Sequence, residues 1–224
     1  MANTDTVDPN KNVEDQLDEG KDFENRSVSH PYEPGSVAKV VTAAAALQEG
    51  VTTPDEVHQV PGSIDMAGVT VNDAWEHGTE PYTTTGIFGK SSNVGTLMIA
   101  DKLGQEKYAD YLKKFGLGNT TGVELPNESA GSVPDLEQWS GGTFANLPIG
   151  QGQSWTTLQM ASVYQALANG GERIEPRIID SVKGPDGKDE KLEEPKKNQV
   201  VSPETAKTTV DMFRAVFQLS LIHI

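Results

Sequence analysis

The segment Tyr32-Glu33-Pro34-Gly35-Ser36-Val37-Ala38-Lys39-Val40-Val41 holds the residues on which the interpretation of this chain depends. It places a serine and a lysine three residues apart, directly after the turn signal Pro34-Gly35. If a helix begins at Ser36, both side chains project from the same face. The hydroxyl then lies at the positive end of the helix dipole with an amine one turn below it, an arrangement that activates a weak nucleophile.

The residues that follow Lys39 predict a buried helix. Val40 to Leu47 carry no charge, the first charge is Glu49, and Gly50 is placed to end the helix. A helix that is apolar on every side is buried, so the Lys39 amine is partly desolvated. Desolvation lowers the pKa of the amine, and a neutral amine can accept a proton from serine. A bare Ser-x-x-Lys arises by chance about once in a chain of this length, so it is the buried helix after Lys39 that favours a catalytic role for the pair.

Composition limits the possible functions. The 224 residues suffice for one large or two small domains, and 35% are hydrophobic. The net charge of -15 argues against nucleic-acid binding and against an electrostatic membrane anchor. Cysteine is absent, which excludes disulfides and cysteine-based metal sites. The scattered histidines show no metal spacing, and we expect all of them at the surface or in loops: His30, His58, His77 and His223.

Periodicity and turn signals predict further elements. Residues 51–89 lack helical periodicity, which predicts a long loop-rich segment of the kind that often lines a functional site. Helices are expected over residues 93–103 and 105–115. A third begins with the capping box Thr156 and Gln159, extends to about 168, and is expected to bury Leu158, Ala161, Tyr164 and Leu167. We expect a strand over 177–182 and a last helix from Ser202 to about Phe217.

A second constellation is the junction Lys90-Ser91-Ser92-Asn93, where a loop leads into a helix. Ser91 and Asn93 are spaced so that both can face one pocket across the turn. Ser91 would relay a proton, and the Asn93 amide would donate to and accept from a peptide-like substrate. The ordinary alternative is that these residues only cap the helix.

Together these segments resemble the active-site region of class B penicillin-binding proteins, the monofunctional D,D-transpeptidases that cross-link peptidoglycan. The resemblance covers about residues 2–217 and follows the family's motif order. Further similar segments are Phe115-Gly116-Leu117-Gly118, Thr121-Gly122-Val123, Leu125-Pro126-Asn127-Glu128, Gly150-Gln151-Gly152 and Thr156-Thr157-Leu158-Gln159-Met160-Ala161, and Asn3 with Asp8-Pro9-Asn10 is similar to the end of the strand before the active-site helix. As a set these motifs are specific, and they imply an α/β (α+β) fold of the penicillin-binding protein and serine β-lactamase type.

The resemblance also implies roles for the matched residues. Ser36 is the nucleophile, its N–H is half of the oxyanion hole, and Lys39 is the general base for acylation. Ser91 belongs to the network that passes a proton to the leaving D-alanine. The implied substrate-binding residues are Asn93, Gly150, Gln151, Gly152 and Trp155, of which Trp155 is the tryptophan expected to border the cleft. The resemblance implies no metal and no cofactor.

The sequence departs from the family at the third motif, Lys-Thr/Ser-Gly. Lys207-Thr208-Thr209 lacks the glycine and lies in a predicted helix. We therefore expect residues 1–218 to be a partial transpeptidase domain, without an N-terminal anchor and without the C-terminal sheet strands, and residues 219–224 to be a non-native tail. Helices that should pack on the sheet would then expose apolar faces, so we expect this polypeptide to be poorly stable and inactive.

For the intact protein, the resemblance implies acyl transfer that cross-links peptidoglycan stem peptides through a serine acyl-enzyme, in cell-wall synthesis and division. The implied partners are D-Ala-D-Ala stem peptides, β-lactam antibiotics, a glycosyltransferase and other cell-wall proteins, at the extracytoplasmic face of the cytoplasmic membrane. One alternative is a D,D-carboxypeptidase, β-lactamase or β-lactam sensor with the same acylation chemistry. Another is a non-catalytic scaffold of the same fold, which the missing third motif favours.

Overall fold

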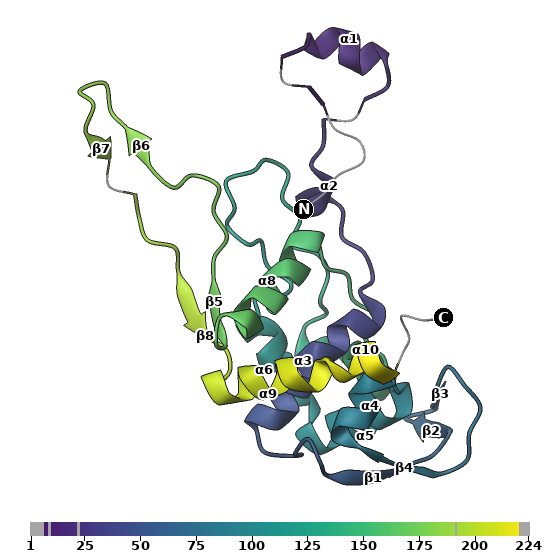
Figure 1. Cartoon of the computed structure of the whole chain (residues 1–224). Coiled ribbons are helices and arrows are strands. Elements are labelled where there is room, and N and C mark those ends of the chain that lie inside the picture. The colour runs from purple at the N-terminus through teal and green to yellow at the C-terminus, as the bar shows by residue number, and fades with distance from the viewer. Residues whose placement is uncertain (1–6, 9, 22, 191, 220–224) are drawn as a thin grey trace.

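Helix α3 (Lys39–Gln48) lies at the centre of the computed structural model, which describes residues 7–8, 10–21, 23–190 and 192–219 (Figure 1). Every residue from Lys39 to Ala46 is buried, as the uncharged sequence predicts. The chain enters α3 through a 3₁₀ helix, η1 (Gly35–Ala38), so the expected α-helical start at Ser36 is wrong. Gly35, with a φ of 56°, starts this tighter turn. Gly50 follows the C-cap with a φ of 65°, which confirms the predicted end.

Three longer helices pack against α3: α5 (Asn93–Leu103), α6 (Gln105–Lys114) and α9 (Pro203–Phe213). A fourth, α8 (Thr157–Ala168), packs against α9. The predictions for α5 and α6 are confirmed to within one residue. Helix α9 begins after its Ser202 cap as predicted, but it ends at Phe213, and a separate helix α10 (Ala215–Leu219) follows. The main core cluster between these helices includes Tyr108, Phe115, Leu147, Trp155 and Val163.

Residues 51–89, for which we predict a long loop, hold four short strands and helix α4 (Thr84–Gly89). Strand β1 (Val57–Val60) pairs antiparallel with β4 (Glu80–Thr83), and β2 (Ser63–Met66) with β3 (Val69–Asn72). Each strand is only four residues long and buries few side chains, so turn residues dominate its sequence pattern. Residues 51–89 nevertheless border the candidate site, because β3 packs against α5.

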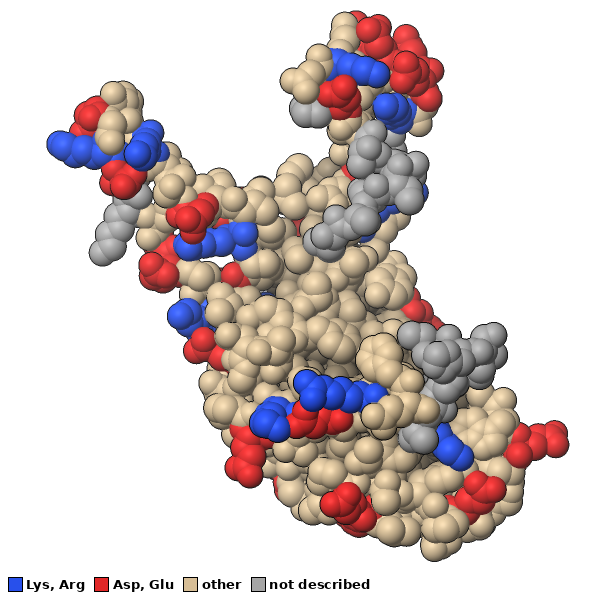
Figure 2. Space-filling model, viewed as in Figure 1, with Lys and Arg blue, Asp and Glu red and all other residues tan. Residues whose placement is uncertain are grey.

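Two segments project from the body (Figure 1): the region of α1 (Val13–Asp18) and the hairpin of β6 (Val182–Lys183) and β7 (Asp189–Glu190). The predicted strand over 177–182 is wrong except at Val182, where β6 begins, because residues 177–181 form no strand. Before them, β5 (Glu172–Ile174) pairs with β8 (Lys197–Gln199). Charged side chains gather on both projections, and the surface over α8 is mostly uncharged (Figure 2). The remaining short helices are α2 (Arg26–Ser29), η2 (Leu136–Gln138), α7 (Gly141–Phe144) and η3 (Leu147–Ile149).

Several predictions concern the ends of the chain. Asn3, Pro9, His223 and the tail residues 220–224 lie outside the described residues. Asp8 and Asn10 form no strand, so the expected strand end is not found where the structure describes this region. No helix in the described part of the chain has the length and apolarity needed to cross a lipid bilayer.

Helix α8 buries a different face from the one predicted. Its buried residues are Gln159, Met160, Ser162, Val163, Ala166 and Leu167. Of the expected stripe only Leu167 is buried, whereas Ala161 and Tyr164 are exposed. The helix is apolar on both faces, so periodicity alone cannot tell which face meets the core.

The capping box of α8 is confirmed, and it supports a test of stability. Thr156 Oγ1 accepts from the Gln159 N–H at 3.1 Å, and Gln159 Oε1 accepts from the Thr156 N–H at 2.7 Å. We expect Thr156→Ala to lower the free energy of unfolding by about 1 kcal/mol, because one orphan N–H loses its acceptor. Thr157→Ala, at the exposed first position of the helix, is the matched control. Chemical denaturation measures both, and equal losses would contradict the prediction.

Candidate active site

The amine of Lys39 lies where α3 meets the start of α5. Nζ donates to Ser91 O at 2.7 Å, to Ser91 Oγ at 3.0 Å and to Asn93 Oδ1 at 2.7 Å. These contacts use all three donors of an ammonium group. Lys39 is only 1% exposed. The structure therefore brings Lys39, Ser91 and Asn93 together.

Burial shifts the titration of this lysine. It lowers the pKa of Lys39 from 10.5 to about 8, while the nearby Asp73 carboxylate acts in the opposite direction. With such a pKa, about one molecule in ten carries the neutral amine at pH 7. A desolvated lysine held by hydrogen bonds can therefore serve as a proton acceptor near neutral pH.

Ser36 lies one 3₁₀ turn before Lys39, and its carbonyl accepts from the Lys39 backbone N–H. Side chains three residues apart eclipse in a 3₁₀ helix, so the hydroxyl and the amine share one face. Ser36 is exposed, whereas Lys39 is buried. Among the hydrogen bonds of the described residues, those of Lys39 Nζ go to Ser91 and Asn93, and none joins it to Ser36 Oγ. The structure thus places an accessible hydroxyl one turn from a desolvated amine, the two groups that a nucleophile and its base require.

The turn before α5 presents alternate residues to opposite sides. Ser91 has a φ of 59°, a left-handed conformation that costs a non-glycine residue about 1–2 kcal/mol and must be held by its surroundings. Ser91 and Asn93 contact Lys39, whereas the Ser92 hydroxyl caps α5 by accepting from the Gly95 N–H at 2.8 Å. Asn93 Nδ2 donates to Asn72 O at 3.1 Å. The Asn93 amide, expected to bind substrate, thus has protein partners at both ends.

The glycine turn 150–152 lies against the backbone that carries Ser36. The Gly35 N–H donates to Gly150 O at 3.0 Å. Gly150 has a φ of 85°, and a β carbon there would lie 1.9 Å from Gly35 O. The Gly152 N–H donates to Glu33 Oε2 at 3.3 Å, and Gln151 is exposed beside this contact. Gly150 therefore supports the turn of Ser36 by close backbone packing.

Trp155 does not border a cleft, contrary to the prediction. Its exposed fraction is 0%, and its indole N–H donates to Gln153 Oε1 at 3.2 Å. Its backbone exchanges two hydrogen bonds of 2.9 Å with Tyr32. A fully buried side chain cannot contact a substrate, so Trp155 is a core residue that anchors the segment leading to Ser36.

Nothing in the local sequence pattern points to Asp73, which lies behind the Ser91–Asn93 turn. Its side chain is fully buried and pairs with His77 Nε2 at 3.0 Å. His58 lies in β1 and is 5% exposed, so the expectation that it lies at the surface or in a loop is wrong. His77 lies in a loop as expected, although its side chain is only 3% exposed. Both are buried by strands and loops that meet only in the folded chain. Among the described residues, no group of three or more side chains could hold a metal ion.

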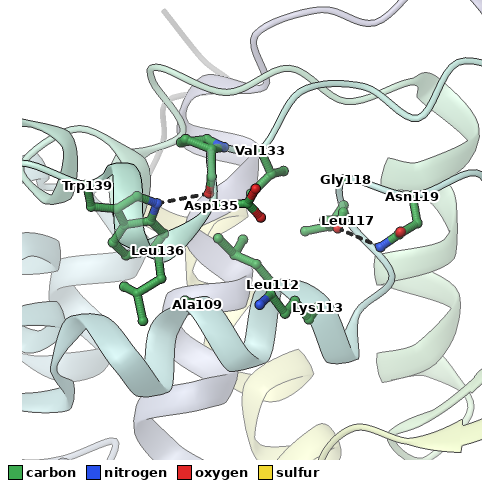
Figure 3. A pocket seen from close by; sticks show the side chains of 11 residues that line it. Ala109, Leu112, Lys113, Leu117, Gly118, Asn119, Val133, Asp135, Leu136 and Trp139 are labelled. Carbon is green, nitrogen blue, oxygen red and sulfur yellow. Dashed lines mark hydrogen bonds between the residues drawn. The ribbon is translucent and has the colours of Figure 1, made fainter.

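A separate cavity of ≈ 320 Å³ lies beside α6 (Figure 3). Its apolar lining includes Leu112, Leu117, Val133 and Trp139, and Lys113 and Asp135 add opposite charges. None of the predicted site residues lines this cavity. This cavity is therefore separate from the site formed by Lys39, Ser91 and Asn93.

Comparison with known proteins identifies relatives over nearly the whole chain. Residues 1–219 match the family described as the penicillin binding protein transpeptidase domain. Penicillin-binding protein PbpB of Mycolicibacterium smegmatis is 58% identical over 218 residues, which are 97% of this chain and 33% of that protein. Peptidoglycan D,D-transpeptidase FtsI of Escherichia coli K12 is 33% identical over 172 residues, covering 76% of this chain and 28% of FtsI.

A solved structure is similar to the same extent. Penicillin binding protein 3 of Mycobacterium tuberculosis, complexed with aztreonam, gives a TM-score of 0.92 at 57% identity and covers 97% of this chain and 48% of that one. The same protein has been solved in complex with ampicillin, with the same TM-score of 0.92. This chain spans about a third of the length of the curated relatives it matches.

Proposed function

The chain belongs to the family of penicillin-binding protein transpeptidase domains, and from this premise we propose that it serves acyl transfer to peptidoglycan stem peptides through an acyl-enzyme at Ser36. One observation carries the proposal: a buried lysine with a pKa of about 8 lies one turn from an exposed serine and is held by Ser91 and Asn93. The relatives named D,D-transpeptidase or penicillin-binding protein support the substrate class.

In the proposed acylation, the neutral Lys39 amine takes the proton of Ser36 Oγ. The oxygen attacks the carbonyl carbon of the penultimate D-alanine, and the Ser36 backbone N–H supports the oxyanion. As the peptide bond breaks, Ser91 passes a proton from Lys39 to the nitrogen of the departing D-alanine. The amine of a second stem peptide then attacks the ester carbonyl, and its proton returns through Lys39 to Ser36 Oγ as the ester C–O bond breaks. A β-lactam carbonyl enters at the first step, which accords with the aztreonam and ampicillin complexes of the M. tuberculosis relative.

We further propose that residues 1–218 are part of a transpeptidase domain whose remaining strands cover the outer face of α8. A hollow of ≈ 350 Å³ on this face is lined mainly by apolar groups, among them Leu158, Ala161, Ile174 and Pro176. Tyr164 of the same helix is 39% exposed, and Ile178, two residues after Pro176, is 60% exposed. Contiguous exposed apolar surface of this kind marks a contact site. The Lys-Thr/Ser-Gly motif would come with those strands, and residues 219–224 remain a predicted non-native tail.

The family membership and the relatives support a place in the cell envelope, at the extracytoplasmic face of the cytoplasmic membrane, for the protein of which this domain is part. There it would act on stem peptides that end in D-Ala-D-Ala, bind β-lactams, and work beside a glycosyltransferase and other cell-wall proteins. The D,D-carboxypeptidase, β-lactamase and sensor alternatives share the acylation step and differ in how the acyl-enzyme is resolved.

The test is covalent labelling by a fluorescent penicillin, applied to this chain and to a chimera in which residues 1–218 replace the matching segment of M. smegmatis PbpB. We expect the label on Ser36 of the chimera, located by peptide mass mapping, and its complete loss in Ser36→Ala. A folded chimera that takes no label would overturn the proposal and favour the scaffold alternative. Rapid turnover of penicillin by the chimera would instead favour the β-lactamase alternative.

A further inference from the structure

We propose that Asp73 is the positioning residue of the acylation site, because it holds the turn that carries Ser91 and Asn93 against Lys39. The inference rests on the proposed function and adds a residue that the motifs do not contain. Asp73 follows β3 directly and lies on the side of the turn opposite Lys39. The hydrogen-bond partners of its carboxylate are Ser92, Val94 and His77, so it acts on the site through other residues.

The contacts of Asp73 fix the start of α5 from behind. Oδ2 accepts from Ser92 Oγ at 2.7 Å, and Oδ1 accepts from the Val94 N–H at 3.0 Å. The Ser92 hydroxyl is therefore both an acceptor for the helix N-terminus and a donor to a buried carboxylate. Charge-assisted hydrogen bonds of this length are about twice as strong as neutral ones. The capping residue of α5, Ser92, is thus held by a buried side chain outside the helix, that of Asp73.

This contact with Asp73 controls the two residues on the other side of the turn. Ser91 and Asn93 flank Ser92, so any movement of Ser92 moves both partners of the Lys39 amine. The left-handed backbone at Ser91 would relax without support. Lys39 contacts this turn from the front and Asp73 from the back. The geometry of the amine relative to Ser91 and Asn93 therefore depends on a residue that touches none of the reacting atoms.

Asp73 is itself held in place. His77 Nε2 donates to Oδ2 at 3.0 Å, and the His77 ring stacks on Trp75 with 5.3 Å between ring centroids. A β carbon at Gly62 would lie 2.2 Å from His77 O, so the β1–β2 connection packs closely against the loop that carries His77. The charged and titratable groups facing the carboxylate are His77 and, across the turn, Lys39.

Positioning and a purely electrostatic role predict opposite results for Asp73→Asn. The charge of Asp73 raises the pKa of Lys39 against the effect of burial. Its removal lowers that pKa, so more of the amine is neutral at pH 7, and a purely electrostatic role predicts faster acylation. Loss of positioning predicts slower acylation at every pH. A 1 Å misplacement of a catalytic group can cost about 100-fold in rate.

The experiment measures penicillin acylation of the chimera, separated into the acylation rate constant and the dissociation constant of the preceding complex. For Asp73→Asn we expect the rate constant to fall at least about tenfold from pH 6 to 9, with the dissociation constant unchanged. Asp101→Asn, which removes an exposed carboxylate of α5, is the control and should change neither constant. An unchanged or faster acylation in Asp73→Asn would overturn the inference.

Two further measurements distinguish a failure of this inference from a failure of the variant to fold and from a failure of the proposed function. If Asp73→Asn does not fold, Ser92→Ala removes one of the three contacts of the Asp73 carboxylate together with the cap on the Gly95 N–H. An acylation rate constant equal to that of the unsubstituted chimera would then overturn the inference. If the unsubstituted chimera takes no penicillin, the proposed function fails, and the inference is then judged in this chain by NMR. There we expect Asp73→Asn to lower the Lys39 titration midpoint and to speed hydrogen exchange at Val94. No change in exchange would overturn it.

Discussion

We expect Lys39→Met to lower the rate of penicillin acylation at Ser36 of the chimera by about 1,000-fold, the size of effect seen when a general base is lost. The substituted side chain fills a similar volume but cannot accept the serine proton. It also leaves the acceptors of Ser91 and Asn93 without their shared donor. Lys102→Met, at a lysine of α5 whose side chain is 45% exposed, is the control and should acylate at the unsubstituted rate. A loss of less than about tenfold in Lys39→Met would assign the base to another group.

The same substitution should change how stability depends on pH. The pKa of Lys39 is lowered in the folded chain to about 8 from 10.5, so between these values the folded state binds fewer protons than the unfolded state. The free energy of unfolding therefore rises with pH across this window, by up to about 3 kcal/mol. Lys39→Met should lack this rise, and Lys102→Met should keep it. Denaturation between pH 7.5 and 10.5 measures the difference.

The parts of the site that could be predicted from sequence are those fixed by local order. Ser36 and Lys39 are three residues apart, so any tight right-handed turn brings them to one face, whether it is α or 3₁₀. The starts of α5, α8 and α9 follow from cap residues that act on N–H groups two or three positions away. Local chemistry is sufficient for these features, and the structure confirms the three helix starts.

The remaining features depend on contacts between distant segments. Asp73 reaches Ser92 and Val94 across about twenty positions of chain. Trp155 is buried because its segment pairs with Tyr32, and no pattern around residue 155 encodes that bridge. The buried face of α8 is chosen by its neighbours, since both faces are apolar. The resemblance identifies the candidate residues, but only the folded structure shows which of them are core residues, supporting residues or site residues.

The second large effect is expected from Gly150→Ala. Gly150 has a φ of 85°, and the added β carbon would lie 1.9 Å from Gly35 O and 2.6 Å from Gly35 C, atoms of the backbone that leads into Ser36. Backbone atoms cannot swing aside as a flexible side chain can, so the 35–150 contact must open. We expect the free energy of unfolding to fall by about 3 kcal/mol or more, combining left-handed strain with overpacking. Penicillin acylation of the chimera should fall by at least about tenfold as Ser36 moves.

Gly187→Ala separates these two contributions. Gly187 has a φ of 79°, close to that of Gly150, but nothing lies within 4 Å of the added β carbon. It sits in the projecting β6–β7 hairpin, so the substitution tests left-handed strain alone and should cost about 1 kcal/mol with no effect on acylation. Chemical denaturation and labelling kinetics on both variants give the comparison. Equal losses of stability would mean that Gly150 is needed only for its backbone angle, whereas the larger loss, accompanied by slower acylation, means that the glycine turn sets the position of the nucleophile.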